Sequence, residues 1–505
     1  MSGEEPGSGP DDATDDVDRG SGTADVVRRE RFSGGPARGF LSSLDADERI
    51  FAADIAVDRA HVVMLAERGI IDESSAGEIL AALAEVRAAG HAALPGGEDV
   101  HAAIETAVVD RVGEVGGRMH TARSRNDEVA TCLRYRLRED LLDAAERTLE
   151  LREVLCEVAG EHSHTVMPGF THLQPAQPTT VGHYLLSYES ALRRDTARLL
   201  DAYDRTNRSP LGAAAFAGTT FDVDRERTAE LLGFDGVVEN SMDAASARDF
   251  LVEATAAVAS LATGLSGVAE DLVIFSNRGL VDLDDDYAST SSIMPQKVNP
   301  DTMELVRATA GDAAAGLNGL LTTLKGLPRA YNRDLQRAHG HAFSAIDVVA
   351  ESTEVVAGAV ATADWPEAAL AAAAGEGFST ATGVADLLAA SGVPFRTAHE
   401  MVALAAEAVD AGGAADYAAL DAAARETLGE PLEAHVEAEA VERALDPAES
   451  VASRDSFGGP APDAVADALG RAADRRAADE GSLTDRREML AAAADRLDRE
   501  VSRYV

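Results

Sequence analysis

Apolar residues recur at helical spacing through the middle of the chain, over long stretches. Between residues 126 and about 162, Val129, Leu133, Leu137 and Leu141 follow one another four positions apart, which places them on one face of a helix. The same pattern predicts four more long helices, at about 179–207, 243–275, 299–324 and 335–361. Most of the five exceed the roughly 8 to 20 residues of ordinary globular helices. Because several are rich in alanine on more than one face, we expect them to pack on one another and on other subunits.

The regions that flank these helices differ in texture. Residues 28–117 read as an N-terminal domain of short helices separated by glycine and proline, and residues 118–373 as the central long-helix domain. From residue 374 four glycines interrupt the pattern, so residues 374–505 are predicted to form a small helical C-terminal domain. The sequence shows neither alternating strands and helices nor runs of period-two strands. The prediction is an all-α fold with a central bundle of long helices.

Composition supports close helix packing, and charge indicates the environment. Hydrophobic residues make up 46% of the chain but aromatic residues only 4%, so alanine and leucine supply the apolar surface. The formal net charge is −43, from 88 acids against 45 bases. Residues 1–27 hold eight of these acids and one arginine and are predicted to be a disordered acidic tail. The other acids continue along every predicted helix, which indicates adaptation to a salty cytoplasm, where molar salt shortens the Debye length to about 3 Å.

The same features exclude several classes of function. So acidic a surface disfavours nucleic-acid binding. Cys132 and Cys156 are the only cysteines and do not show a metal-type spacing. Since neither a secretory segment nor an apolar run long enough to cross a bilayer is evident, we expect a soluble cytoplasmic protein that does not bind membranes.

Two polar segments precede long predicted helices. Residues 120–127 (HTARSRND) place two arginines and an asparagine at a helix start, where they could bind a carboxylate or simply cap the helix. Residues 168–178 (PGFTHLQPAQP) contain three prolines and a glycine, which hold the chain out of helix and fix the position of His172. His172 could be a structural histidine or a proton-transfer group. The neighbouring Thr171, Gln174 and Gln177 favour a polar pocket.

The third segment is the decapeptide 291–300 (SSIMPQKVNP). It holds Lys297, one of only two lysines in the chain, the other being Lys325. We predict that Asn299 caps a helix whose first residue is Pro300. A ligand carboxylate would then meet Lys297, the Asn299 amide and the positive end of the helix dipole. The acidic cluster just before this loop lacks the glycine that a calcium-binding loop needs at its sixth position, so no metal is expected there.

These three segments together fit one kind of chemistry. Removing a proton next to a carboxylate creates a doubly charged carbanion, which requires fixed cations, a base on one side and an acid for the leaving group on the other. A lysine, a helix N-terminus, a loop serine and a histidine supply these groups without a metal or cofactor. The sequence therefore predicts β-elimination that releases an unsaturated dicarboxylate.

The three segments also resemble the signature regions of the fumarase/aspartase superfamily. Residues 291–300 are similar to its diagnostic loop, and Gln296 together with residues 120–127 is similar to the argininosuccinate lyase family rather than to fumarase or adenylosuccinate lyase. Further similar segments are residues 240–243 (NSMD), 324–336 (LKGLPRAYNRDLQ) and 392–396 (GVPFR). The resemblance covers residues 28–505.

This resemblance implies a homotetramer whose active sites are each built by three subunits, and cleavage of argininosuccinate to arginine and fumarate. Ser291 would take the proton, Lys297 would bind a carboxylate, and His172, oriented by Glu304, would act on the leaving group. The implied substrate-binding residues are Thr171, Arg125, Asn126, Asn299, Tyr331 and Gln336. Whether Thr171 or His172 delivers the proton is left open.

Three positions depart from the pattern of the family. Thr290 replaces a frequent glycine, Asp58 replaces a substrate-binding serine, and His339 replaces a lysine, which removes a fixed cation. The alternatives are a sibling lyase of the same superfamily and a non-catalytic relative like the lens crystallins. A sibling would carry histidine or glycine in place of Gln296. The joint presence of Ser291, His172 and Lys297 argues against a non-catalytic protein.

Overall fold

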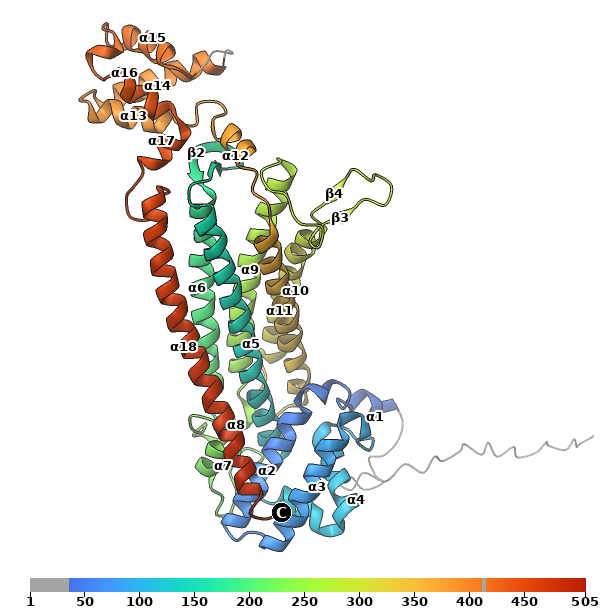
Figure 1. The fold of residues 1–505 in the computed structure, drawn as a ribbon. Coiled ribbons are helices and arrows are strands. Elements are labelled where there is room, and N and C mark those ends of the chain that lie inside the picture. Colours follow the sequence, from blue (N-terminus) through green and yellow to red (C-terminus); the bar gives the residue numbers. More distant parts are fainter. Residues whose placement is uncertain (1–35, 411–414) are drawn as a thin grey trace, which may run out of the picture.

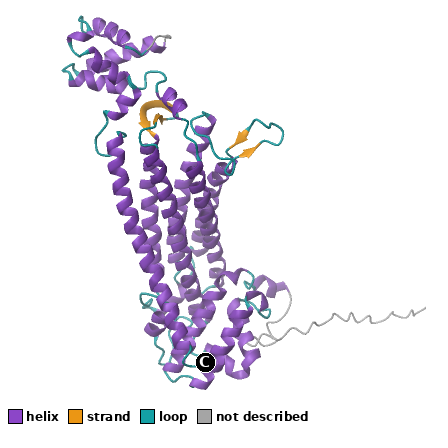
Figure 2. Ribbon diagram, viewed as in Figure 1, coloured by secondary structure: helices purple, strands orange, loops and turns teal. Residues whose placement is uncertain are grey.

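The computed structural model describes residues 36–410 and 415–505. The described chain is 71% helical, which confirms the predicted all-α fold. The predicted acidic tail, residues 1–27, lies outside the described residues. Figure 2 shows two short antiparallel hairpins among the helices, β1 (Val166–Thr171) with β2 (Gln174–Thr180), and β3 (Ser289–Thr290) with β4 (Val298–Asn299).

Six long helices run side by side as the body of the molecule (Figure 1). They are α5 (Arg125–Glu161), α6 (Val181–Thr206), α9 (Asp249–Asn277), α10 (Asp301–Leu324), α11 (Ala338–Thr362) and α18 (Pro462–Val501). The predicted helix at 126–162 agrees with α5 to within one residue at each end. Its start is fixed by a capping box, in which the Ser124 side chain caps the helix and the Asp127 carboxylate accepts from the Ser124 N–H.

Local backbone conformation explains two of the differences between predicted and observed helix starts. The stretch at 243–275 is two helices, α8 (Ser241–Ser246) and α9, because Ala247 adopts an extended conformation with φ −61° and ψ 130°. The prediction that Asn299 caps α10 is wrong. Asn299 lies in β4 opposite Ser289, and Pro300 occupies the cap position without a side-chain hydrogen bond. Because Asn299 is paired within the hairpin, the helix begins later, at Asp301, and Pro300 rather than Asn299 occupies the cap position.

The N-terminal region covers one end of the bundle (Figure 1). Its α-helices are α1 (Pro36–Leu41), α2 (Phe51–Glu67), α3 (Glu73–Ala89) and α4 (Val100–Val112), with α7 (Arg225–Leu231) and α8 nearby. Its 3-10 helices are η2 (Ala46–Ile50), η3 (His91–Ala93) and η4 (Gly113–His120), and η5 (Arg333–Arg337) precedes α11. Since α2 packs on α5 and shares its apolar core, this end of the bundle is closed by side chains from both regions.

The opposite end of the bundle carries a small helical unit. It contains α13 (Ala381–Ala390), α14 (Phe395–Asp410), α15 (Tyr417–Thr427), η6 (Leu432–Ala434) and α16 (Ala438–Leu445), and α12 (Glu367–Ala374) and α17 (Pro447–Ala452) flank it. Its core is separate from that of the bundle and extends from Val384 to Val441.

Helix α18 does not belong to this small unit, which corrects the predicted domain 374–505. The helix starts at Pro462 and returns along α5 and α6 to the N-terminal end. The buried Arg152 of α5 pairs with Glu189 of α6 at 3.0 Å and with Asp479 of α18 at 2.7 Å. Val465 is one of several α18 side chains in the main core. The position of α18 is decided by burial of one of its faces against the bundle, and local composition does not predict this burial.

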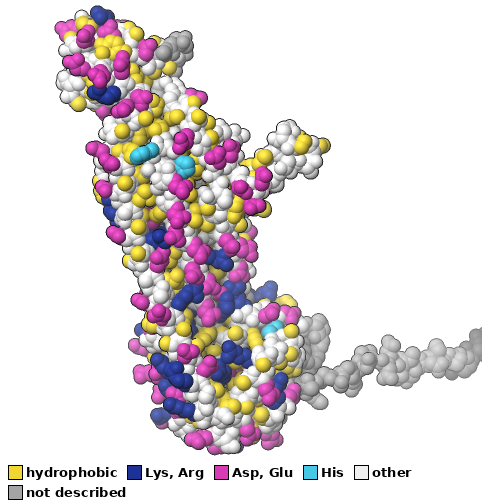
Figure 3. All heavy atoms as spheres, in the orientation of Figure 1, with side chains coloured by type: hydrophobic (Ala, Val, Ile, Leu, Met, Phe, Trp, Pro, Cys, Tyr) yellow, Lys and Arg dark blue, Asp and Glu magenta, His cyan; other side chains and the backbone are white. Residues whose placement is uncertain are grey.

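Contrary to the expectation from the sequence, helix α9 is long and apolar enough to cross a membrane by length and composition, and among the described residues it alone meets both criteria. It packs on α6, α10 and α11 within the bundle, which is the setting of a core helix. Neighbouring α10 leaves a wide side uncovered along its length, and Leu305 at one edge of it is 67% and Leu321 at the other 47% exposed. Figure 3 shows acidic side chains over the whole length of the visible face, with apolar atoms between them along the bundle.

Candidate functional site

A cavity of about 220 Å³ lies where the N-terminal region meets the ends of the long helices. Four of the residues predicted to bind substrate line it, Arg125, Asn126, Tyr331 and Gln336. They come from the first turn of α5 and from the segment between α10 and α11. The fold thus brings together residues that are about 200 positions apart in the chain, as long helices that run the length of a bundle allow.

Asp127, in the first turn of α5, fixes this turn to the segment that follows α6. Its buried carboxylate accepts hydrogen bonds from the Gly212 and Ala214 N–H groups, both at 2.9 Å. Burial raises the pKa of Asp127 to about 6 in spite of these bonds. Asn126 Nδ2 donates to Ala215 O at 3.1 Å, and Arg125 Nη1 donates to Asp99 at 3.2 Å. Arg125 Nη2 is buried and has no hydrogen-bond partner among the described residues.

The segment from α10 to α11 supplies the facing wall. Gln336 Nε2 donates to Leu41 O at 3.0 Å, which joins this segment to the end of α1. Ala330 has a positive φ of 70°, so the chain turns sharply just before Tyr331. Burial raises the pKa of Tyr331, which keeps the phenol protonated and able to donate.

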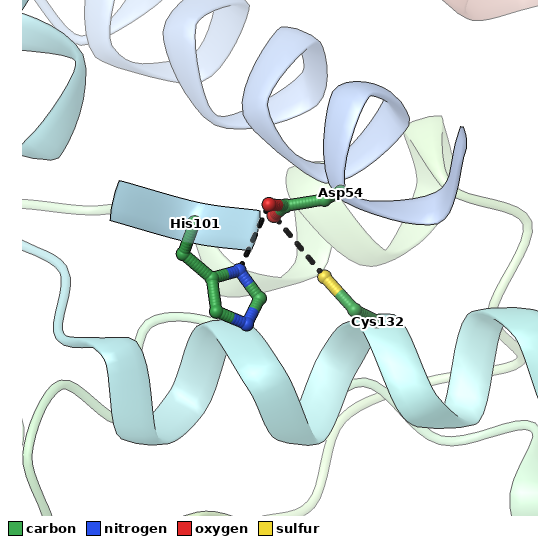
Figure 4. Close-up of side chains that lie close together, drawn as sticks. All are labelled: Asp54, His101 and Cys132. Carbon is green, nitrogen blue, oxygen red and sulfur yellow. Dashed lines mark hydrogen bonds and ion pairs between the residues drawn. The ribbon is translucent and has the colours of Figure 1, made fainter. Parts of the chain in front are cut away.

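His101, which is not among the residues predicted from the sequence, also lines this cavity. In Figure 4 its imidazole from α4 and the Cys132 thiol from α5 both point at the Asp54 carboxylate from α2. His101 Nδ1 lies 2.8 Å from Asp54 Oδ2, and Cys132 Sγ lies 3.3 Å from Asp54 Oδ1. Burial alone would lower the pKa of His101, but Asp54 and Glu128 outweigh it and raise the pKa to about 10. The cavity wall therefore carries an imidazolium at neutral pH.

Asp54, His101 and Cys132 bring their ligand atoms within 4.8 Å of one another, and this donor set would suit zinc. Both Asp54 oxygens are already engaged by the other two side chains. The surroundings extend this pairing, because buried Arg123 lies 2.5 Å from Asp58 and 2.8 Å from Glu128. We therefore interpret the cluster as a buried ion-pair network. Burial raises the pKa of Asp58 to about 7, and its carboxylate faces Arg123 inside this network.

The β1–β2 hairpin carries Thr171 and His172, both exposed at its tip. His172 has a φ of 58° and Leu173 a φ of 59°, so the tip is a left-handed turn. Arg278 holds this turn, since it donates to Leu173 O at 3.1 Å and lies over the Phe170 ring at 4.6 Å. Thr171 also borders a second, open cavity beside residues 376–382.

The β3–β4 hairpin carries the predicted catalytic decapeptide and projects from the body of the molecule (Figure 1). The Ser291 N–H donates to Lys297 O at 2.9 Å, and the Ser291 hydroxyl accepts from the Met294 N–H at 3.2 Å. The Lys297 ammonium donates to the Asn299 side-chain oxygen. Glu304 is exposed in the first turn of α10. These groups therefore face outward from a single chain.

The predicted site residues thus occupy opposite ends of one chain. Lys297 precedes α10 and Tyr331 follows it, and the 24 residues of that helix span about 36 Å. Arg125 begins α5 and His172 follows its far end, across 37 residues or about 55 Å. Figure 1 shows both hairpins at one end of the bundle and the N-terminal region at the other. One chain alone does not bring the ten predicted residues into a single pocket.

Sequence comparison places the chain among lyases. Residues 40–314 match the family described as "Lyase", and residues 378–452 match "Argininosuccinate lyase C-terminal". An argininosuccinate lyase of Natronomonas pharaonis is 74% identical over 97% of this chain and 99% of its own length. One from Halobacterium salinarum is 66% identical over 95% and 99%, and one from Methanosarcina acetivorans is 47% identical over 89% and 92%.

Solved structures agree with this placement. A crystal structure of EDDS lyase in complex with formate has a TM-score of 0.82 and 33% identity, covering 93% of this chain and 96% of that one. A class II fumarase from Schistosoma mansoni, at 16% identity and a TM-score of 0.68 over 84% and 96%, shares the fold. With relatives of this identity over nearly its whole length, the chain belongs to the argininosuccinate lyase family.

Proposed function

We propose that this protein cleaves argininosuccinate to arginine and fumarate as a step of arginine biosynthesis, as a homotetramer in a salty cytoplasm. The observation that carries the proposal is the joint presence of the two halves of the predicted site. Four substrate-binding side chains line one cavity, and the decapeptide with Ser291 and Lys297 projects from the far end of the same chain. The relatives named argininosuccinate lyase support the choice of substrate.

In this mechanism Ser291, as its alkoxide, removes a proton from the succinyl carbon next to the one that bears nitrogen. The electron pair of that C–H bond delocalises into the adjacent carboxylate, and Lys297 stabilises the resulting dianion. When the C–N bond breaks, this pair becomes the C=C bond of fumarate. When the C–N bond breaks, the guanidino nitrogen keeps the electron pair of that bond. His172 or Thr171 gives this nitrogen a proton, so that no negative charge remains on it. All the groups that act in these steps are side chains found in this sequence.

The site is completed by assembly, with different subunits contributing the cavity, the β1–β2 hairpin and the β3–β4 hairpin. Two features support this. The helices that separate the groups are about 36 and 55 Å long, too long for either hairpin to reach the cavity of its own chain. A wide side of α10 is uncovered and carries exposed Leu305 and Leu321 near its two edges, which helices of other subunits would bury.

The test is an assay of purified protein in molar KCl with a panel of succinyl compounds. With argininosuccinate we expect the ultraviolet absorbance of fumarate to rise. The panel includes adenylosuccinate, aspartate, malate and EDDS, the last because of the similar EDDS lyase structure. Activity with one of these and not with argininosuccinate would assign the protein to a sibling reaction, and inactivity with all of them would favour a non-catalytic relative.

A further inference from the structure

Three donor-bearing atoms in the wall of the 220 Å³ cavity are buried and have no hydrogen-bond partner among the described residues. They are Arg125 Nη2, Arg248 Nε and His339 Nδ1. Arg248 is 3% and His339 7% exposed, so neither side chain is freely solvated. Buried polar atoms in folded proteins are nearly always bonded, and because these three residues line one cavity, a single ligand bound there can reach all of them.

Arg248 is the most unusual of the three. Its Nη1 donates to Ala247 O at 2.8 Å and to Ala245 O at 3.5 Å, both at the end of α8. The charged group that acts on it is Arg134, which is repulsive, and the neutral Tyr331 phenol also lies nearby. Burial and Arg134 lower the pKa of Arg248 to about 10, so it stays a cation at neutral pH. A buried cation without a carboxylate costs free energy unless an anion binds beside it.

Other buried arginines of the described chain pair with carboxylates or carbonyl oxygens of the same chain. Arg123 and Arg152 each pair with two carboxylates. Arg138 has no carboxylate either, but it donates to Asn207 Oδ1 at 2.8 Å and to the Gly233 and Leu232 carbonyls at 2.9 Å. It also stacks on Phe234 within the core. Arg248 instead lines the cavity, which makes it the arginine whose partner would come from solution.

His339 cannot supply the positive charge in its place. Burial lowers the pKa of His339 to about 4, with Arg248 and His101 contributing in the same direction. The imidazole is therefore neutral at pH 7 and offers only a hydrogen bond. Arg125 already donates to Asp99. Among these three groups, Arg248 alone is a cation without a counter-charge.

We infer that Arg248 binds the α-carboxylate at the arginine end of the substrate, a specificity role that rests on the proposed function. Ser291 and Lys297 act on the succinyl end and lie on a different segment, so the cavity is left for the amino-acid end. The same cavity is lined by Asp47 and Asp99, whose carboxylates can receive the neighbouring α-ammonium group. A cavity with a fixed cation and fixed acids matches a zwitterion.

The experiment compares two ligands on two variants by calorimetric titration of the assembled protein in molar KCl. L-arginine carries the carboxylate, and L-argininamide replaces it with a neutral amide. We expect Arg248→Gln to weaken arginine binding about 10- to 100-fold, the effect of one charge-assisted contact, and to leave argininamide binding unchanged within about twofold. Arg248→Lys keeps the charge and should recover part of the loss. The KM for argininosuccinate should rise with the arginine Kd while kcat changes less.

Arg138→Gln is the matched control. Because Arg138 donates to three internal oxygen atoms, its loss should lower the melting temperature while the folded protein binds arginine normally. Equal weakening of arginine and argininamide by Arg248→Gln would show a structural role and overturn the inference, as would an unchanged arginine affinity. If Arg248→Gln does not fold, the same comparison is made on Arg248→Lys, where a loss of affinity confined to arginine supports the inference and an equal loss for arginine and argininamide refutes it. A wild-type protein that binds arginine but releases no fumarate would contradict the proposed reaction and not this assignment.

Discussion

His101 Nδ1 lies 2.8 Å from Asp54 Oδ2, and this contact joins α4 to α2 inside the wall of the candidate substrate cavity. Asp54 is fully buried, so its carboxylate depends on the imidazolium and on Arg123 for compensation. Because removing one member of a buried ion pair leaves the other uncompensated, the contact couples the stability of the N-terminal region to pH.

The first prediction concerns this pH dependence. The folded-state pKa of His101 is about 10, above its ordinary value of 6.5, so its stabilisation is complete below about pH 6.5 and is lost as pH rises through 10. The free energy of unfolding should therefore fall between pH 7 and 10. Asp54→Asn should lower it by about 3 to 5 kcal/mol at pH 7 and reduce this slope. Urea denaturation in molar KCl measures both.

The exposed Asp45 gives the control for this experiment. Its side chain makes no cap hydrogen bond, so Asp45→Asn should change the free energy of unfolding by no more than about 0.5 kcal/mol. An Asp54→Asn protein that keeps the full slope between pH 7 and 10 would show that His101 is not the titrating group.

A second prediction separates the two serines of the β3–β4 hairpin. Ser291→Ala should lower kcat by several orders of magnitude without changing the assembly, because it removes the proposed base. Ser292→Ala changes the adjacent hydroxyl and should retain activity within about tenfold. Steady-state kinetics and native mass are measured on both. Comparable losses from the two substitutions would remove Ser291 from its proposed role.

A third prediction uses the two lysines. Lys297→Met should raise the inhibition constant of fumarate and lower kcat, since it removes the ammonium that is proposed to stabilise the developing dianion. We expect a loss of about 100- to 1000-fold in kcat/KM, typical of removing one preorganised charge contact. Lys325→Met, at the other end of α10, should leave both values nearly unchanged. Equal fumarate inhibition of Lys297→Met and wild type would contradict the assignment.

A fourth prediction tests whether the sites are shared. Ser291→Ala and Gln336→Ala disable groups at opposite ends of one chain, so each homo-oligomer should be inactive. After joint refolding at equal amounts, about a quarter of the sites should combine an intact Ser291 from one chain with an intact Gln336 from another. Fumarate release by the mixture measures this recovery. A mixture as inactive as its components, with mixed oligomers verified by mass, would show that each site uses one chain.

A fifth prediction concerns salt. The net charge of −43 is screened over about 3 Å at molar salt but over about 10 Å at 0.1 M, so repulsion between subunits should dissociate the oligomer at low salt. Native mass at about 0.1 M and 2 M KCl measures it. Leu305→Glu should cause dissociation at high salt as well, because it places a charge on the uncovered face of α10. An oligomer that persists in both conditions would contradict the salt adaptation.

Much of the secondary structure followed from local pattern. The period of apolar residues in α5 is repeated every turn, so a single sequence sufficed to place its ends within one residue. The start of α10 and the break before α9 were missed. Both depend on backbone conformation at Asn299 and Ala247, where hairpin pairing and an extended residue override the helical pattern.

The sequence by itself determined the all-α class, the segments that hold Arg125, His172 and Ser291, and the acidic surface, because each is a property of neighbouring residues or of composition. The tertiary structure alone decided that α18 packs along the bundle and that His101 meets Asp54 across 47 positions. It also placed Arg248 in a cavity wall where no carboxylate of the described residues pairs with it. Such contacts depend on which helix faces come together, and this is set by burial of the whole apolar core and not by any local stretch of residues.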